Sequence, residues 1–323
     1  MKLKMVVVLL MMVCAHLSLS AKMLFATGYS ENKDLKVAGQ EAAQQIKKKF
    51  GKERPKLVIV SVITNNKKVD LSGVLANFDK NIVFGSSNAG VITTDKVIES
   101  GIAILAFAGD VDVKTAFASL DKKGNKCGKN LGEQILKQGG LKKDGQNLCI
   151  VAGDCHHPKN NFIAQGIMAK LGKQLPIVGA AADGPKLVIY KGEVKFNGAI
   201  ALLINSEFKV GYGMAGSGAR DEKELLEMAD KSVKSAVAEN APELLLMFDC
   251  AGRRRALRKH NAIGKEFDVI KKYAKNAEIF GFYGQGEVGK TSAKETSYGS
   301  GYHVSTCSIS VVKEKKCNKG CSK

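Results

Sequence analysis

Short apolar runs recur along the chain, and each ends in a polar or glycine-containing loop. The runs are Leu57–Ser61, Leu148–Val151 and Leu244–Phe248. Apolar segments of this length are too short for most helices and are typical of strands buried on both faces of a parallel sheet. Loops after such strands are where open α/β sheets place their ligand crevices. The pattern indicates one structural unit used three times.

A helix and a second strand follow each of these runs. The helices are expected near Leu71–Phe78, Phe162–Leu171 and Phe267–Ala274, and the second strands open into glycine loops at Gly85, Gly179 and Gly281. Strand, helix and strand at this spacing fit β-α-β crossovers. A hairpin is expected from Leu187–Tyr190 and Val194–Phe196, which flank a Lys-Gly turn. We therefore predict an α/β fold with layered, mostly parallel sheets of repeated βαβ units and an antiparallel hairpin edge.

Between these units the pattern predicts further helices and loops. Asp34 to Phe50 is expected to be a helix with Asp34 as N-cap and Gly51 ending it. Glu222–Glu239 is expected to be an amphipathic helix, and Val304–Val312 the last strand. The glycines from Gly211 to Gly218 indicate loops.

The first 21 residues have the features of a signal peptide. Lys2 and Lys4 precede an apolar core, and Ser18-Leu19-Ser20 forms a small-x-small cleavage site before Ala21. The mature protein is thus expected to be exported, periplasmic or secreted. Val13 before Cys14 argues against a lipoprotein signal, which requires a small residue there. No later stretch is apolar enough for a transmembrane helix.

Charge and composition exclude several classes of partner and cofactor. The formal net charge is +19, but the lysines are scattered and the chain has no Trp, so no nucleic-acid surface is predicted. The loop Gly85–Gly90 lacks both the GxGxxG and the Walker spacing, so no nucleotide cofactor is predicted. His156 and His157 are adjacent on one loop, where side chains rarely converge on one ion, so no metal site is predicted.

The order of several motifs resembles the FIST domain family, a group of bacterial sensory modules with paired N-terminal and C-terminal halves. LVIVS, VFGSSNAG (Val83–Gly90), PIVGAAADG (Pro176–Gly184) and NGAIALLI (Asn197–Ile204) carry the N-terminal match. The C-terminal match consists of MFDCAGR (Met247–Arg253), GFYGQGEV (Gly281–Val288), and His303 with Thr306. The resemblance implies that the protein binds small ligands such as amino acids or their derivatives.

The resemblance also implies a division of the chain. Residues 1–21 are the signal peptide, 22–206 a FIST N-like α/β domain, 207–313 a shortened FIST C-like α/β domain, and 314–323 a basic tail with two cysteines. The segment from Ser206 to Pro242 is shorter than the family's usual one, and no output domain is present in the sequence. The family's usual cytoplasmic setting is also replaced by the predicted signal peptide.

Candidate ligand-binding residues lie at the strand ends. The set is Ser86, Ser87, Asn88, Asp183, Asp249, Arg253, Tyr283 and Glu287. Backbone N–H groups, hydroxyls and an amide in the loop after Val83 suit a carboxylate or phosphate, although a plain tight turn would look the same. Asp183 could pair with a ligand ammonium or cap a turn, and Tyr283 could line a pocket or belong to the core.

Asp249 and Arg253 allow two interpretations. In one, they form an internal ion pair that fixes the loop. In the other, the arginine faces a ligand carboxylate and Asp249 orients it. A thiol enzyme with Cys250 as nucleophile would need a base such as His303, and no nucleophile motif supports it.

The function predicted from the sequence is an exported FIST-like protein that binds an anionic or zwitterionic metabolite such as an amino acid. An envelope signalling protein is a possible partner. The alternatives are a hydrolase or transferase using Cys250 or Asp249 with His303, and an envelope scaffold with a filled pocket.

Overall fold

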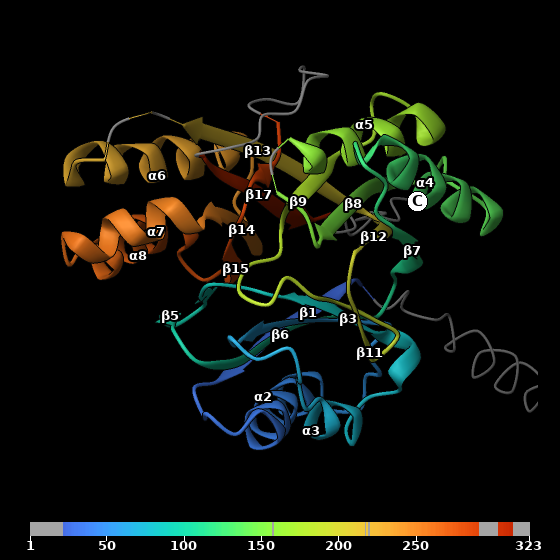
Figure 1. The fold of residues 1–323 in the computed structure, drawn as a ribbon, viewed down its shortest axis with the longest axis horizontal. Coiled ribbons are helices and arrows are strands. Elements are labelled where there is room, and N and C mark those ends of the chain that lie inside the picture. The colour runs from blue at the N-terminus through green and yellow to red at the C-terminus, as the bar shows by residue number, and fades with distance from the viewer. Residues whose placement is uncertain (1–21, 157, 217, 219, 291–302, 313–323) are drawn as a thin grey trace, which may run out of the picture.

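The computed structural model describes residues 22–156, 158–216, 218, 220–290 and 303–312. Three sheets surround a common core, with helices on their outer faces (Figure 1). The predicted signal peptide, the basic tail, His157 and most of the loop before the last strand lie outside the described residues.

Three consecutive units, each contributing most of one sheet, build the fold. The first comprises β1 (Leu24–Ser30), α2 (Leu35–Phe50), β2 (Leu57–Ile63), α3 (Ser72–Leu75), the 3-10 turn η1 (Lys80–Ile82), β3 (Val83–Ser87), β4 (Val91–Thr93), β5 (Val97–Ile98) and β6 (Gly101–Ala108). The second comprises β7 (Asp112–Ser119), α4 (Asn125–Lys137), β8 (Gln146–Gly153), α5 (Lys159–Leu171), β9 (Ile177–Ala181), β10 (Val188–Tyr190), β11 (Glu193–Lys195) and β12 (Gly198–Ser206). The third comprises β13 (Phe208–Gly216), α6 (Glu222–Ala236), β14 (Leu244–Cys250), α7 (Ala251–Lys259), α8 (Ile263–Ala274), β15 (Glu278–Gly284), β16 (Glu287–Val288) and β17 (His303–Val311).

The predicted α/β class and the threefold reuse of one unit are confirmed. The strand orders are β1-β6-β2-β3-β10-β11, β7-β12-β8-β9-β16 and β13-β17-β14-β15-β4-β5. In each sheet the two strands joined by the βαβ crossover are parallel, and the described neighbours on either side are antiparallel. The parallel pairing expected from the sequence is thus confined to the centre of each sheet. The hairpin β10–β11 forms an antiparallel edge, as expected.

The three units exchange strands in a closed cycle. β4 of the first unit pairs with β15 of the third, β16 of the third pairs with β9 of the second, and β10 of the second pairs with β3 of the first. The backbones of Ser87, Ala181 and Tyr283 make equivalent bonds, because each accepts an N–H from the segment that crosses into its sheet. The ends of β3, β9 and β15, far apart in sequence, are therefore held next to one another.

A glycine at the same register position lets the parallel strands approach closely. Gly85, Gly179 and Gly281 pair with Val60, Val151 and Met247 on the neighbouring strands. A Cβ atom on these glycines would lie 1.8, 2.0 and 2.1 Å from the carbonyl oxygens of those residues. Since real Cβ contacts do not reach such distances, the glycine in each predicted strand-end loop is a packing requirement of the unit.

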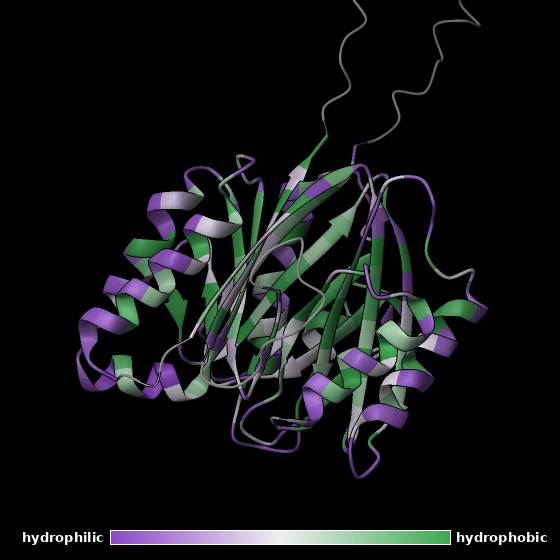
Figure 2. Cartoon of the chain, turned by 90° about the horizontal axis from the view of Figure 1, so that it is seen from above, coloured by the Kyte–Doolittle hydropathy of each residue, from purple (hydrophilic) through white to green (hydrophobic). Residues whose placement is uncertain are grey.

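Among the described residues, the apolar side chains form one central core, three outer cores between the sheets and the helices, and a smaller cluster of α6, α7 and the start of α8. The central core takes residues such as Phe84, Ile150 and Phe248 from the inner faces of all three sheets. The outer cores lie between the first sheet and α2, the second sheet and α4 with α5, and the third sheet and α6 with α8. Figure 2 shows the hydrophobic colour on the strands and hydrophilic residues along the outer helices.

Local signals in the sequence set some element boundaries correctly and missed others. Asp34 caps α2 by accepting N–H bonds from Lys36 and Val37, and Gly51 follows its last residue, as predicted. The predicted loops at Gly211 and Gly213 are wrong, since both glycines lie in β13. Their Cβ atoms would meet the carbonyl oxygens of Ala236 and Ser232 on α6, so glycine is needed for α6 to lie directly on this strand.

Within the described residues, no helix combines the length and apolar character of a membrane span.

Candidate functional site

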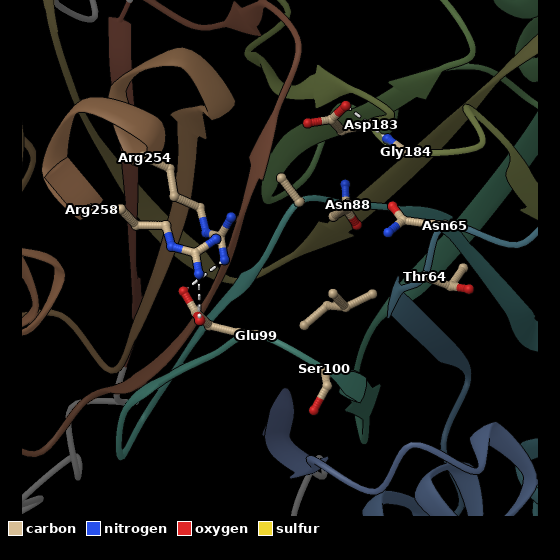
Figure 3. Close-up of a pocket in the computed structure, with 11 residues that line it drawn as sticks. Thr64, Asn65, Asn88, Glu99, Ser100, Asp183, Gly184, Arg254 and Arg258 are labelled. Atoms are coloured by element: carbon tan, nitrogen blue, oxygen red, sulfur yellow. Dashed lines mark hydrogen bonds and ion pairs between the residues drawn. The ribbon is translucent and has the colours of Figure 1, made fainter.

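A polar cavity of about 410 Å³ lies where the three units meet. It is lined by Ile63, Thr64, Asn65, Asn88, Ala89, Glu99, Ser100, Asp183, Gly184, Arg254 and Arg258 (Figure 3). The ends of β2 and β3 and the turn before β6 come from the first unit, the end of β9 from the second, and α7 from the third. The size is within the usual range for small-molecule sites.

Asn88 offers an unused hydrogen-bond donor to this cavity. Its Oδ1 accepts bonds from Ser61 Oγ at 2.5 Å and Ser86 Oγ at 3.3 Å. These two hydroxyls hold the amide oxygen, and the side chain belongs to the cavity lining (Figure 3). Asn88 is 1% exposed, and its Nδ2 has no hydrogen-bond partner among the described residues. Because buried polar groups are nearly always paired, an orphan donor at a cavity wall indicates a ligand or water position.

Asp183 provides the carboxylate on another wall. Its Oδ1 accepts from Gly184 N at 2.7 Å and from Gln285 Nε2 at 2.6 Å. Ser87 holds the backbone, because its Oγ donates to the Asp183 carbonyl at 2.6 Å. Both carboxylate contacts come from neutral donors, so the negative charge remains available to a cationic group in the cavity.

Two arginines one helical turn apart on α7 form the opposite wall. Arg254 Nη2 donates to Glu99 Oε1 at 2.8 Å, and Arg258 Nη2 lies 3.5 Å from Glu99 Oε2. The Arg254 guanidinium lies 5.8 Å from the centre of the Tyr283 ring, and it packs on Gly90, where a Cβ atom would lie 2.8 Å from Nε. Arg254 is 7% exposed, and its Nε has no hydrogen-bond partner in the described chain.

Asp249 and Arg253 lie behind this wall in a separate buried network. Arg253 Nε donates to Asp249 Oδ1 at 2.7 Å, while its Nη2 donates to Glu266. Both terminal nitrogens also bond to the Leu225 carbonyl, at 3.3 and 3.2 Å. Arg253, Asp249 and Glu266 are fully buried. Of the two interpretations left open by the sequence, this geometry favours the internal ion pair.

The charge balance in this network favours the protonated form of one carboxyl group. Arg253 supplies one positive charge to two carboxylates, and a buried unpaired charge is costly. Burial raises the pKa of Glu266 to about 8, with Asp249 adding to the shift and Arg253 opposing it. Tyr283 donates its hydroxyl to Glu266 Oε2 at 2.8 Å and is itself fully buried. Tyr283 therefore joins this network to the guanidinium of Arg254.

Glu287, Cys250 and His303 occupy a different place from the cavity. Glu287 pairs with Ala180 through β16, and its carboxyl oxygens accept N–H bonds from Gly286 and His303. Burial, with Asp249 nearby, raises the pKa of Glu287 well above its usual value. Burial also raises the pKa of the Cys250 thiol to about 12, with Glu287 adding to the effect. A thiol that is protonated at neutral pH is poorly suited to the alternative role of nucleophile.

The sequence-based candidates thus separate into three groups. Asn88 and Asp183 line the cavity, with Ser86 and Ser87 holding them from behind. Asp249, Arg253 and Tyr283 form the buried network. Glu287 lies near Asp249 and is not among the residues that line the cavity. Among the described residues, no group of three or more His, Cys, Asp or Glu is placed to hold a metal ion.

Other residues of the cavity were not among the candidates. They are Ile63, Thr64, Asn65, Ala89, Glu99, Ser100, Gly184, Arg254 and Arg258. Two signals could have found some of them. Thr64 and Asn65 directly follow the first buried strand, and Arg254 and Arg258 have the spacing of side chains on one helix face.

Comparisons with known proteins identify the family of the chain. The FIST N domain matches residues 56–220, and the FIST C domain matches residues 209–290. Among curated proteins, no sequence matches the chain.

Solved structures of similar shape include two of cyanuric acid hydrolase. The enzyme from A. caulinodans has a TM-score of 0.48 and 10% identity, and the comparison covers 89% of this chain and 99% of that one. A second cyanuric acid hydrolase has a TM-score of 0.43 and 9% identity, covering 90% and 100%. These values are too low to transfer an activity. The two domain matches together span most of the chain, which therefore belongs to the FIST family, whose domains are generally sensory and bind small ligands.

Proposed function

We propose that the cavity between the three units binds a small zwitterionic metabolite such as an amino acid, and that the protein senses this ligand without reacting with it. The observation that carries the proposal is the Asn88 amide at the cavity wall, whose buried Nδ2 has no hydrogen-bond partner among the described residues. A ligand oxygen would satisfy this donor, which a folded chain seldom leaves unpaired.

The charges around the cavity support a ligand with both signs. Arg254 and Arg258 on α7 attract a carboxylate, and Arg254 is held in place by Gly90 and the Tyr283 ring. Asp183, with only neutral hydrogen-bond donors on its contacted oxygen, attracts an ammonium. Since the lining carries two arginines and two acidic residues, a ligand of zero net charge matches it best.

Calorimetric titration with amino acids and small carboxylates tests this proposal. Arg254→Ala should abolish ligand binding and leave the fold intact, because Arg254 borders a solvent-accessible cavity. Arg255 lies on the same helix but is exposed and does not line the cavity. Arg255→Ala is therefore the matched control for loss of one charge from α7, and it should bind like the wild type. Equal binding by both variants would contradict the proposal.

Asp183 provides an independent test of the ammonium site. Asp183→Asn keeps the size of the side chain and removes its charge. We expect it to weaken binding of an amino acid while leaving binding of the corresponding simple carboxylate unchanged. A matching loss for both ligands would place the ammonium elsewhere.

We also propose that the protein works outside the cytoplasm and passes its ligand state to an envelope signalling protein. The basic start, apolar core and small-x-small site of residues 1–21 support export. Mass spectrometry of the N-terminus after expression in a bacterium tests this. Cleavage near the Ser20–Ala21 bond is expected. A protein in the envelope fraction that still begins with Met1 would count against cleavage of a signal peptide.

A further inference from the structure

We propose that Glu99 is an internal competitor for the ligand carboxylate and so determines which ligands the cavity accepts. This inference rests on the proposed function of the cavity. Glu99 lies between β5 and β6, and its carboxylate already occupies the position on Arg254 and Arg258 that a ligand carboxylate would take (Figure 3).

The two partners of this ion pair differ in how much they depend on it. The Glu99 side chain is 45% exposed, whereas the Arg254 side chain is 8% exposed. Returned to water, Glu99 would regain hydration of its carboxylate at little cost, as is usual for a surface carboxylate. Arg254 would be left with an unpaired buried charge unless another anion replaced it. Exchange of Glu99 for a ligand carboxylate keeps Arg254 paired, so exchange is favoured over simple opening.

The surroundings of Glu99 allow its side chain to move without disturbing the core. Ile98, just before it, is fully buried and pairs with Val91, and Ser100 just after it donates its hydroxyl to the Glu31 carbonyl at 2.8 Å. The backbone is therefore held on both sides. Release of Glu99 requires only that its side chain rotate away from α7.

Competition has a direct consequence for specificity. A simple carboxylate gains the contacts to Arg254 and Asn88 but loses those that Glu99 had made, so its net gain is small. A zwitterion makes the same exchange and also pairs its ammonium with Asp183. Glu99 thereby lowers the affinity of the cavity for all carboxylates. Only a ligand whose ammonium also pairs with Asp183 binds tightly.

Matched probe pairs that differ by one ammonium group test this role. The pairs are glycine with acetate, and 4-aminobutyrate with butyrate. The two amino acids also differ from each other in the distance between the ammonium and the carboxylate. Binding is followed by NMR through the side-chain Nε–H signal of Arg254, assigned by its loss in Arg254→Lys. We expect Glu99→Gln to tighten binding of both members of a pair by about fivefold, the value of one partly exposed ion pair.

Glu31→Gln is the matched control. Glu31 also forms a partly exposed ion pair, with Lys96, and does not line the cavity. This variant removes the same charge from the same part of the molecule and should bind all four probes like the wild type. A gain as large as that of Glu99→Gln would mean that net charge, and not competition, causes the effect.

The remaining outcomes separate this inference from the proposed function. If Glu99→Gln weakens the amino probes and leaves acetate and butyrate unchanged, Glu99 holds the ammonium and the competitor role is refuted, while the ligand site stands. If Glu99→Gln changes no affinity, the competitor role is also refuted. If none of the four probes shifts the Arg254 signal in either protein, the ligand site itself is refuted, and the role of Glu99 with it.

Discussion

Replacement of Arg253 by methionine separates the buried ion pair from the ligand site most sharply. Arg253→Met keeps most of the side-chain volume and removes the charge. It leaves the carboxylate of Asp249 buried without a cation, and it leaves the Leu225 carbonyl without the guanidinium that now bonds to it. Removing one member of a buried ion pair costs about 3–5 kcal/mol.

A loss of this size is a large fraction of the stability of an ordinary domain, which is about 5–15 kcal/mol. Arg254→Met provides the comparison, because its ion pair with Glu99 is partly exposed and is worth about 1 kcal/mol or less. The expected result is therefore a large loss of stability with Arg253→Met and a loss of ligand binding with Arg254→Met, although the two residues are adjacent.

Urea unfolding at pH 7 measures the first effect, and calorimetric titration measures the second. The double variant Arg253→Met with Asp249→Asn should regain more than about 1 kcal/mol relative to Arg253→Met, because no buried charge remains unpaired. The reasoning would be refuted if Arg253→Met unfolded within about 1 kcal/mol of the wild type and abolished ligand binding. Arg253 would then be a ligand residue.

Four further variants test other parts of the structure. Because burial raises the pKa of Glu266 from 4.5 to about 8, the folded chain holds its proton more tightly than the unfolded chain. The contribution of Glu266 to stability should therefore be most favourable below pH 4.5 and decline towards pH 8, by up to about 1.4 kcal/mol per pH unit. Urea unfolding between pH 5 and 8.5 should show a smaller decline in Glu266→Gln, and an unchanged slope would mean that Glu266 is ionised in the fold. Gly179→Ala should destabilise the chain by about 2 kcal/mol or more in thermal or urea unfolding, because its Cβ would lie 2.0 Å from the Val151 carbonyl oxygen at a φ of +147°. Gly264 lies exposed in α8 with open space around it, so the control Gly264→Ala should instead stabilise the chain by up to about 1 kcal/mol. Asn88→Ala should weaken ligand binding about tenfold by calorimetry, the usual value of one hydrogen bond, and unchanged affinity would remove the amide from the site.

The repeated unit was readable from the sequence because its signals are local. Buried strands and the helices between them recur, and so does a glycine near the end of each second strand, at Gly85, Gly179 and Gly281. The strands continue past these glycines, to Ser87, Ala181 and Gly284, and all three glycines have the same role in the fold. Asp34 and Gly51 mark the ends of α2 for the same reason, since capping depends only on neighbouring residues.

Elements whose sequence is shaped by a distant contact were missed. β13 contains glycines because α6 lies directly on it, so its pattern resembles a loop. α7 has no apolar stripe that sequence reasoning could detect, because part of its buried face consists of Arg253 and Arg254. Asp249, four residues before Arg253, is a local partner that the sequence suggested. The other partners, Glu266 of α8 and Glu99 of the turn before β6, are not connected with α7 by any local pattern.

The sequence by itself determined the repeated α/β unit, the family, and the fact that polar side chains gather at strand ends. Two of its candidate ligand-binding residues, Asn88 and Asp183, are among the residues that line the cavity. Only the tertiary structure decided that Arg254, and not Arg253, faces that cavity. Successive residues of a helix point about 100° apart, so the role of each arginine depends on how α7 is rotated against its neighbours. These neighbours are α6, α8, β14 and β15, and α6 and β15 are not adjacent to α7 in the sequence, so no local pattern determines the rotation.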